Sequence, residues 1–223
     1  MKPPESISDQ IYKHLFERIQ HGEITAQDRL VEWRVAQDLN VSRTPVREAF
    51  LRLENEGVFE RLPQGGMRVR PVTEQAVEQI FDIRALLEPY AVALACENIS
   101  QEDIAQLKRL RDSAWEVIND DSPIQESRIK TILRLNTEFH DIIYLSTYNP
   151  FLIQIINNLR SIVLHMRSLG VRENKAWIKA WTEHDRLIEF LESGSSNRAA
   201  ALMREHVQNA KNDVRAQADQ GAQ

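Results

Sequence analysis

The sequence predicts a mainly α-helical chain of two domains, in which three helices and a β-hairpin precede an antiparallel bundle of six helices. Its length of 223 residues exceeds the usual size of one domain. Apolar residues recur with helical spacing from residue 73 onward, whereas the alternation typical of strands occurs only before that point. We therefore expect one domain over residues 1–72 and a second over residues 73–223.

The composition is that of an ordinary globular protein, with 42% hydrophobic and 27% charged residues. A net charge of −5 argues against a protein that coats nucleic acid or acidic membrane over its whole surface. The first 72 residues carry 11 basic and 11 acidic side chains, so the excess of acid lies in the second domain. No apolar run approaches the ~20 residues that span a bilayer, and the N-terminus lacks the apolar stretch of a signal peptide. We expect a cytoplasmic chain without membrane contact.

Apolar periodicity places three helices in the first domain. The first covers residues 6–21, the second is marked by apolar residues from Val31 to Leu39, and the third is capped by Ser42 or Thr44 and ends at Gly57. The apolar positions of the third helix share one face, and they are Val46, Ala49, Phe50 and Leu53. Two short alternating segments follow, at residues 58–62 and 67–70, around a turn that contains two glycines. The first domain is therefore expected to be a winged helix-turn-helix, with the hairpin as its wing.

Arg43, Thr44 and Arg47 lie outside this apolar face, at the N-terminal end of the third helix. A helix-turn-helix presents that helix end to the major groove of DNA, where arginine makes bidentate contacts with guanine and hydroxyl groups hold phosphate. Glycines in the wing allow close approach to the sugar-phosphate backbone. The simpler alternative is that both arginines belong to a solvated helix face.

The run from Leu39 to Gly57 resembles the signature of the GntR family of bacterial regulators, and the likeness extends over residues 7–72. The resemblance implies that DNA is contacted by Arg34, Arg43, Thr44, Arg47 and Gly66. The sequence departs from the family at Ala26-Gln27, where Pro-Gly is usual, so the loop before the second helix is expected to differ in shape.

The second domain is predicted to contain six helices. Four are expected at about residues 73–97, 124–147, 174–192 and 196–217, and the other two are expected to start at Ser100 and at Asn149-Pro150. Ser100 and Asp103 form a capping-box pattern at the start of the second of these helices. Asn149-Pro150 marks the start of the fourth, and Gly194 separates the last two. Ligand and metal sites in such bundles are built from inward-facing side chains of different helices.

Four side chains of the second domain are candidate metal ligands. Asn136 and His140 are separated by four residues and therefore share a helix face. His184 and His206 lie on the fifth and sixth helices of the bundle. A histidine within a helix is more often a packing residue than a ligand, so the sequence alone leaves both interpretations open for these two.

The second domain also resembles the FCD effector domain of the FadR branch of that family. The landmarks are residues 84–91, 136–140, 183–184 and 203–206. The resemblance implies a divalent ion held by Asn136, His140, His184 and His206. Asn136 replaces the usual Asp, so the site loses a negative charge and should bind metal more weakly. Three imidazoles suit zinc or nickel.

In the FCD domain the ion helps to hold a carboxylate effector, and Arg84 or Arg167 could pair with that carboxylate. Both arginines could instead be structural. The sequence therefore predicts a homodimeric, sequence-specific DNA-binding regulator, a repressor by family analogy, that is controlled by a small organic acid. One alternative is a metal-dependent hydrolytic enzyme, although Glu138, Glu183 and Glu205 are expected to point away from the ligand face. Another is a structural DNA-binding dimer without an effector.

Overall fold

The computed structural model describes residues 6–20, 23–71, 73–120, 122–168 and 174–221. It divides into two compact units. The first unit comprises residues 1–73 together with residues 158–169, and the second comprises residues 74–157 and 170–223. Among the described residues, no helix is long and apolar enough to cross a membrane.

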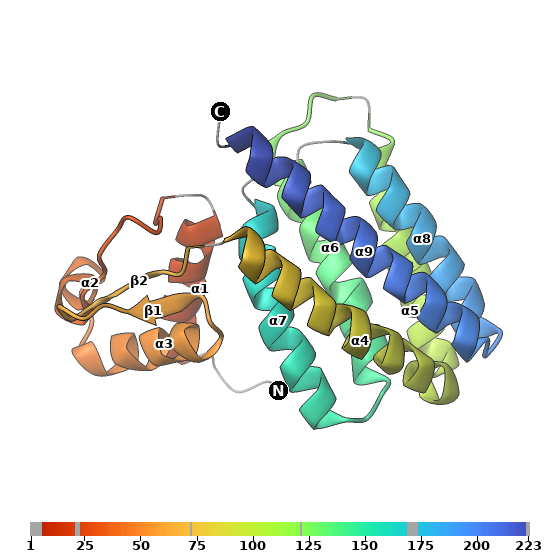
Figure 1. The fold of residues 1–223 in the computed structure, drawn as a ribbon, viewed down its shortest axis with the longest axis horizontal. Coiled ribbons are helices and arrows are strands. Elements are labelled where there is room, and N and C mark those ends of the chain that lie inside the picture. The colour runs from red at the N-terminus through yellow and green to blue at the C-terminus, as the bar shows by residue number, and fades with distance from the viewer. Residues whose placement is uncertain (1–5, 21–22, 72, 121, 169–173, 222–223) are drawn as a thin grey trace. The chain divides into compact units, whose positions relative to one another are not determined.

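The first unit contains three helices and a two-stranded antiparallel sheet (Figure 1). These elements are α1 (Ile7–Gln20), α2 (Glu32–Asp38), α3 (Arg43–Asn55), β1 (Phe59–Arg61) and β2 (Met67–Val69). Phe59 pairs with Val69, and Leu30 adds an isolated bridge to Met67. The buried core is built from one apolar face of each helix and from both strands, with Leu15, Ile19, Val46, Leu53 and Phe59 at its centre.

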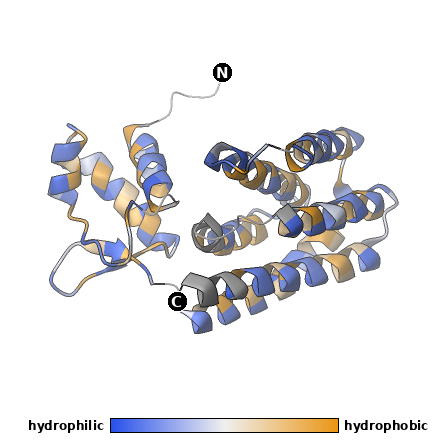
Figure 2. Cartoon of the chain, turned by 90° about the horizontal axis from the view of Figure 1, so that it is seen from above, coloured by the Kyte–Doolittle hydropathy of each residue, from blue (hydrophilic) through white to orange (hydrophobic). Residues whose placement is uncertain are grey.

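The second unit is entirely helical in its described residues. Its helices are α4 (Glu74–Asn98), α5 (Gln101–Ile118), α6 (Glu126–Leu145), α7 (Pro150–Ser168), α8 (Asn174–Glu192) and α9 (Ser196–Gly221), of which α7 also contributes its second half to the first unit. Helices α4 and α9 run side by side over much of their length. Figure 2 shows that the helices carry hydrophobic and hydrophilic residues on different faces, as amphipathic packing requires.

Local sequence signals explain several helix ends. The Ser100 hydroxyl accepts a hydrogen bond from the Asp103 backbone N–H (3.1 Å), and the Asp103 carboxylate accepts one from the Ser100 N–H (3.3 Å), so the predicted capping box is present. The Asn149 side chain caps α7 by accepting from the Leu152 N–H at 3.1 Å. Gly194 has φ +64° at the turn between α8 and α9, a backbone conformation that glycine adopts without strain.

Helix α4 has apolar side chains on two opposite faces. One face is buried and includes Val77, Phe81 and Ala91. The opposite face exposes Ile83 (45%), Leu86 (70%) and Tyr90 (55%), which follow one another at helical intervals of three and four residues. A surface helix usually carries a single apolar stripe, so the exposed stripe of α4 requires an explanation of its own.

The predicted fold class, an N-terminal winged helix-turn-helix followed by six helices, is confirmed. Most helix bounds agree with the expectation to within one or two residues. The strands are shorter than expected, because the paired residues run only from Phe59–Val69 to Arg61–Met67. Ser42 occupies the N-cap position of α3, but its side chain makes no capping hydrogen bond.

Candidate DNA-binding face and buried histidine cluster

The N-terminal end of α3 exposes the three side chains that the sequence singles out. Arg43, Thr44 and Arg47 are all exposed, whereas Val46 and Phe50 on the other side of the helix are buried. The helix is therefore held by its apolar side and offers a cationic end to solvent. This arrangement is the one that groove recognition by a helix-turn-helix needs.

Glu32, in the first turn of α2, forms ion pairs with both Arg43 and Arg47. The sequence alone did not identify this residue. The Arg47 Nη2 atom lies 3.3 Å from Glu32 Oε2, and the Arg43 Nη2 atom lies 3.6 Å from the same oxygen. Both arginine side chains remain more than 60% exposed. Exposed ion pairs contribute little stability, about 0–1 kcal/mol, so a DNA phosphate or guanine can replace the carboxylate. Glu32 orients the two guanidinium groups in the absence of DNA.

Arg34 and the wing complete the set of predicted DNA contacts. Arg34 is exposed, and its guanidinium carbon lies 5.2 Å from the centre of the Trp33 ring. The wing turn is fastened by Arg29, which donates from Nε to the Gly65 carbonyl (2.9 Å) and from Nη2 to the Gln64 carbonyl (2.8 Å). Arg29 had no motif to mark it, because its partners are backbone atoms far along the chain.

Gly66 is required by the fold of the wing itself. Its φ of +84° is unfavourable for other residues, and a Cβ atom there would lie 2.7 Å from the Leu30 carbonyl oxygen. This carbonyl accepts the Met67 N–H that forms the bridge between the wing and the chain before α2. The protein's own fold therefore requires glycine at position 66, because the Leu30 carbonyl lies so close, and this requirement does not depend on DNA.

We expect Gly66→Ala to lower the melting temperature and to weaken DNA binding, because the new methyl group must displace the backbone carbonyl of Leu30. Gly65→Ala is the matched control: its φ is +81°, but a Cβ atom there would meet only the end of the Arg29 side chain, at 3.9 Å. Thermal unfolding followed by circular dichroism compares the two variants. Equal losses in both would show that the positive φ, and not the contact with Leu30, is what matters.

Three buried histidines from different helices meet inside the second unit. His140 of α6, His184 of α8 and His206 of α9 each offer a ring nitrogen, and these three atoms lie within 4.8 Å of one another. The ring centroids are 4.9–5.3 Å apart. Three inward-facing imidazoles at this spacing form a donor set that suits a first-row divalent ion such as zinc or nickel.

The ring of His206 is oriented by a buried carboxylate. Its Nδ1 lies 2.6 Å from Glu183 Oε2, and the other Glu183 oxygen accepts from the Asn209 amide at 2.6 Å. Burial by itself raises the pKa of the Glu183 carboxyl, but the hydrogen bonds from His206 and Asn209 outweigh it and hold that pKa below its usual value. An ionised Glu183 accepts a hydrogen bond from His206 Nδ1–H, which leaves Nε2 as the ligand atom, as in many metal-binding histidines.

His140 is oriented by a tyrosine. The Tyr144 hydroxyl donates to Glu88 Oε2 at 2.8 Å and lies 3.2 Å from His140 Nδ1. Since the hydroxyl proton is directed at the carboxylate, the Tyr144 oxygen accepts from His140 Nδ1–H. Nε2 of His140 is then the nitrogen with a lone pair to offer. Glu88 is completely buried and also accepts from Arg84 Nε at 2.6 Å.

His184 is held by packing against aromatic rings. It is fully buried, and its ring stacks on Phe139 with a centroid distance of 4.3 Å and an interplanar angle of 16°. The Trp181 ring meets it edge-on at 4.6 Å. These contacts fix the imidazole plane from two sides, so the ring has little freedom to turn away from the cluster.

The remaining predicted site residues have different placements. Asn136 lies one turn before His140 on α6 and is half-buried, and its amide remains a proposed fourth ligand. Arg84 is buried, and its guanidinium lies over the Phe81 ring at 4.7 Å. The side chain of Arg167 lies outside the described part of the chain.

The expectation that the neighbouring glutamates point away from the ligand face is wrong for Glu183, which contacts the cluster through His206. Residues adjacent in a helix are about 100° apart, so Glu183 does not share the face of His184, but it faces α9, where His206 lies. Glu205 is exposed, and Glu138 pairs with Arg134 at 2.7 Å. Glu88 and Tyr144 were also missed, because neither their types nor their positions suggested a role.

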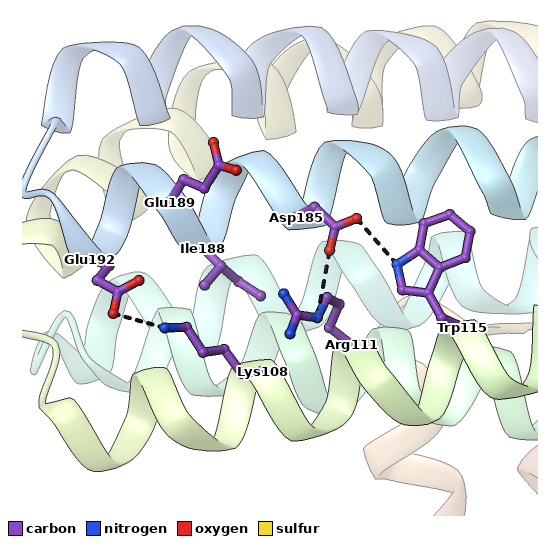
Figure 3. A pocket seen from close by; sticks show the side chains of 7 residues that line it. All are labelled: Lys108, Arg111, Trp115, Asp185, Ile188, Glu189 and Glu192. Carbon is purple, nitrogen blue, oxygen red and sulfur yellow. Dashed lines mark hydrogen bonds and ion pairs between the residues drawn. The ribbon is translucent and has the colours of Figure 1, made fainter.

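A hollow away from the histidine cluster lies between α5 and α8, with a volume of about 570 Å³ (Figure 3). Its lining residues are Lys108, Arg111, Trp115, Asp185, Ile188, Glu189 and Glu192. The Trp115 indole donates to Asp185 at 3.2 Å, and Lys108 pairs with Glu192 at 2.8 Å. Asp185 follows His184 in α8 but points toward α5. Lys108 and Arg111 in this hollow already face carboxylates of the protein. The hollow is therefore a weaker candidate site for a carboxylate ligand than the buried histidine cluster.

A winged helix-turn-helix with an exposed cationic helix end defines a class of DNA-binding proteins, and in this chain a helical unit with a buried histidine cluster follows it. Two family descriptions match the chain: "Bacterial regulatory proteins, gntR family" over residues 7–69 and "FCD domain" over residues 79–209. The chain belongs to the GntR family, in the FadR subfamily with a C-terminal FCD domain. It is a DNA-binding transcriptional regulator and not an enzyme, so the hydrolytic alternative is excluded.

Individual relatives agree with this membership. The "HTH-type transcriptional regulator McbR" of Escherichia coli K12 is 30% identical over 154 residues, which cover 69% of this chain and 67% of that protein. The "Uncharacterized HTH-type transcriptional regulator YdhC" of Bacillus subtilis 168 is 27% identical over 198 residues, which cover 89% of this chain and 84% of that protein. The solved structure of E. coli McbR/YncC has a TM-score of 0.79 at 24% identity and covers 96% of this chain and 99% of that one.

Proposed function

We propose that this regulator binds operator DNA through residues 1–72 and that a small carboxylate, held with a zinc or nickel ion in residues 73–223, controls its DNA affinity. The observation that carries the proposal is the convergence of three buried histidines from α6, α8 and α9. Release of the operator on effector binding, and hence repression, is the proposed direction. Since DNA is its target, the proposed location is the cytoplasm.

The donor set supports an anionic ligand. Three neutral imidazoles leave the charge of a divalent ion uncompensated, and a site with three protein ligands keeps coordination positions open. Arg84 adds a buried guanidinium whose Nη1 has no hydrogen-bond partner among the described residues. An unsatisfied cationic donor in a low-dielectric interior attracts a carboxylate. Asn136, with an amide oxygen, and Arg167 complete the proposed ligand and effector sets.

The DNA contacts are proposed from exposure and residue type. Arg43 and Arg47 are free to exchange Glu32 for DNA, Thr44 offers a hydroxyl, and Arg34 and the Gly66 backbone flank them. Arginine reads guanine in the major groove, whereas backbone and hydroxyl groups hold phosphates. Specific recognition is therefore assigned to the two arginines of α3.

A homodimer is the proposed assembly, with the exposed stripe of α4 as one part of its interface. A two-fold interface brings each surface against its own copy, so like charges in it would repel. The stripe residues Ile83, Leu86 and Tyr90 carry no charge, and neither does the exposed Gln79 one turn before Ile83. The acidic Asp82 beside them is paired with Lys211 at 3.0 Å. Sedimentation velocity tests the dimer: a single species of 25.9 kDa at micromolar concentration would contradict it.

The experiment that tests the function starts from duplexes selected by the purified protein from a random pool. Fluorescence anisotropy then measures the Kd for the selected duplex with zinc chloride and each of a panel of small carboxylic acids. We expect at least one acid to weaken binding by about 5–150-fold, the usual range of allosteric coupling. His140→Ala should bind the same duplex but lose the response. A full response in His140→Ala, or no response to any acid in the wild type, would contradict the proposal.

A further inference from the structure

A chain of hydrogen bonds connects the histidine cluster to Arg84 through buried side chains. Arg84 Nε donates to Glu88 Oε1 at 2.6 Å, Tyr144 donates to Glu88 Oε2 at 2.8 Å, and His140 Nδ1 lies 3.2 Å from the Tyr144 hydroxyl. All four side chains are at least nine-tenths buried. We refer to this chain of four residues as the relay.

The spacing of the relay explains how two helices can hold it. Arg84 and Glu88 are four residues apart on α4, and His140 and Tyr144 are four residues apart on α6, so each pair shares a helix face. Helices α4 and α6 pack against each other. The carboxylate of Glu88 links the two pairs, since it accepts from both Arg84 and Tyr144.

The direction of the hydrogen bonds in the relay is inferred from the protons that each group carries. Glu88 as a carboxylate can only accept, Tyr144 has one proton and gives it to Glu88, and the Tyr144 oxygen therefore accepts from His140. The donors thus run from His140 to Tyr144 to Glu88, and from Arg84 to Glu88 on the other side. A change in charge at His140 acts on Glu88 through Tyr144.

The far end of the relay has an unused donor. Nη1 of Arg84 is buried without a hydrogen-bond partner among the described residues, while Nε is held by Glu88 and one face of the guanidinium is covered by Phe81. The anchored part of the group fixes its orientation. A ligand acceptor that reached Nη1 would satisfy this donor.

We infer that the relay couples the two ligands of this domain, so that a divalent ion at the histidine cluster and a carboxylate at Arg84 bind cooperatively, with Tyr144 as the positioning residue between them. The inference rests on the metal site proposed above. An ion on His140 Nε2 makes Nδ1–H a stronger donor and polarises the Tyr144 hydroxyl toward Glu88. Glu88 then neutralises Arg84 less, and Arg84 attracts an external carboxylate more. By linkage the carboxylate strengthens ion binding by the same factor.

The test measures zinc affinity of the full chain by competition with a chromogenic chelator, in chloride and in acetate buffer of equal ionic strength. We expect acetate to tighten zinc binding in the wild type by about 5–150-fold. In Tyr144→Phe, zinc should bind about 10–100-fold more weakly, and the acetate effect should shrink toward one. Tyr148→Phe, a loss of the same hydroxyl from an exposed side chain just after α6, should behave as the wild type.

A second variant changes the relay at another residue, so that the conclusion does not depend on the folding of Tyr144→Phe alone. Glu88→Gln keeps the side-chain shape but removes the charge, and we expect it to lose the acetate effect as Tyr144→Phe does. Zinc binding with a full acetate effect in both variants would overturn the relay and leave the metal site intact. Failure of the wild type to bind zinc would overturn the metal site as well, so the two failures are distinguishable.

Discussion

Arg47→Ala is expected to weaken binding of the selected duplex by about 1–3 kcal/mol, a loss of roughly 5–150-fold in affinity. The side chain is exposed at the N-terminal end of α3 and is held only by an exposed ion pair with Glu32, so its removal costs the fold little. If Arg47 reads guanine, the loss should fall mainly on duplexes that carry the correct base. Anisotropy titrations with selected and single-base variant duplexes measure both effects.

Arg134→Ala is the matched control for this change. Arg134 is also an exposed arginine paired with a glutamate, Glu138, but it lies on α6 in the second unit. The control should retain the affinity of the wild type. If Arg47→Ala binds the selected duplex as tightly as the wild type, or if both variants lose affinity equally, then the N-terminal end of α3 does not recognise the DNA sequence.

His184→Leu is expected to lower zinc affinity by at least about 100-fold. Loss of a residue that only hydrogen-bonds a metal ligand costs up to about 100-fold, and loss of a ligand should cost at least as much. Leucine fills much of the same space between Phe139 and Trp181 but offers no ligand atom. Zinc at 100 times its Kd should stabilise the wild type by about 2.7 kcal/mol, and this stabilisation should vanish in the variant. Thermal unfolding with and without zinc gives the comparison.

His14→Leu serves as its control, because His14 is an exposed histidine of α1 in the first unit. It should show the full zinc stabilisation. Zinc-free His184→Leu should melt close to the wild type, since an apolar side chain is well suited to a fully buried position. A variant that remains folded and binds zinc as tightly as the wild type would remove His184 from the site.

The fold could be predicted from the sequence because each helix buries one regular apolar face. Helix α8, Asn174–Glu192, was expected near residues 174–192 from its apolar periodicity, and the structure agrees. The bridge between Leu30 and Met67 was not foreseen, because it depends on two backbone groups far apart in the sequence and on the lack of a Cβ at Gly66.

The site could be predicted only in part. Helical spacing places Asn136 and His140 on one face, but the arrival of His184 and His206 from other helices was an expectation of the family resemblance, which no spacing within one helix could supply. Their convergence is seen in the structure. The supporting residues Glu88 and Tyr144 were missed because hydrogen bonds between different helices leave no local pattern.

A buried ion held by His140, His184 and His206 is the central claim of this account. Crystals of the zinc-loaded chain, measured on both sides of the zinc absorption edge, test it most directly. We predict one strong anomalous peak between α6, α8 and α9, within about 2.0–2.1 Å of a nitrogen of each of the three histidines. An anomalous map in which this position is empty while zinc occupies exposed side chains elsewhere would contradict the claim.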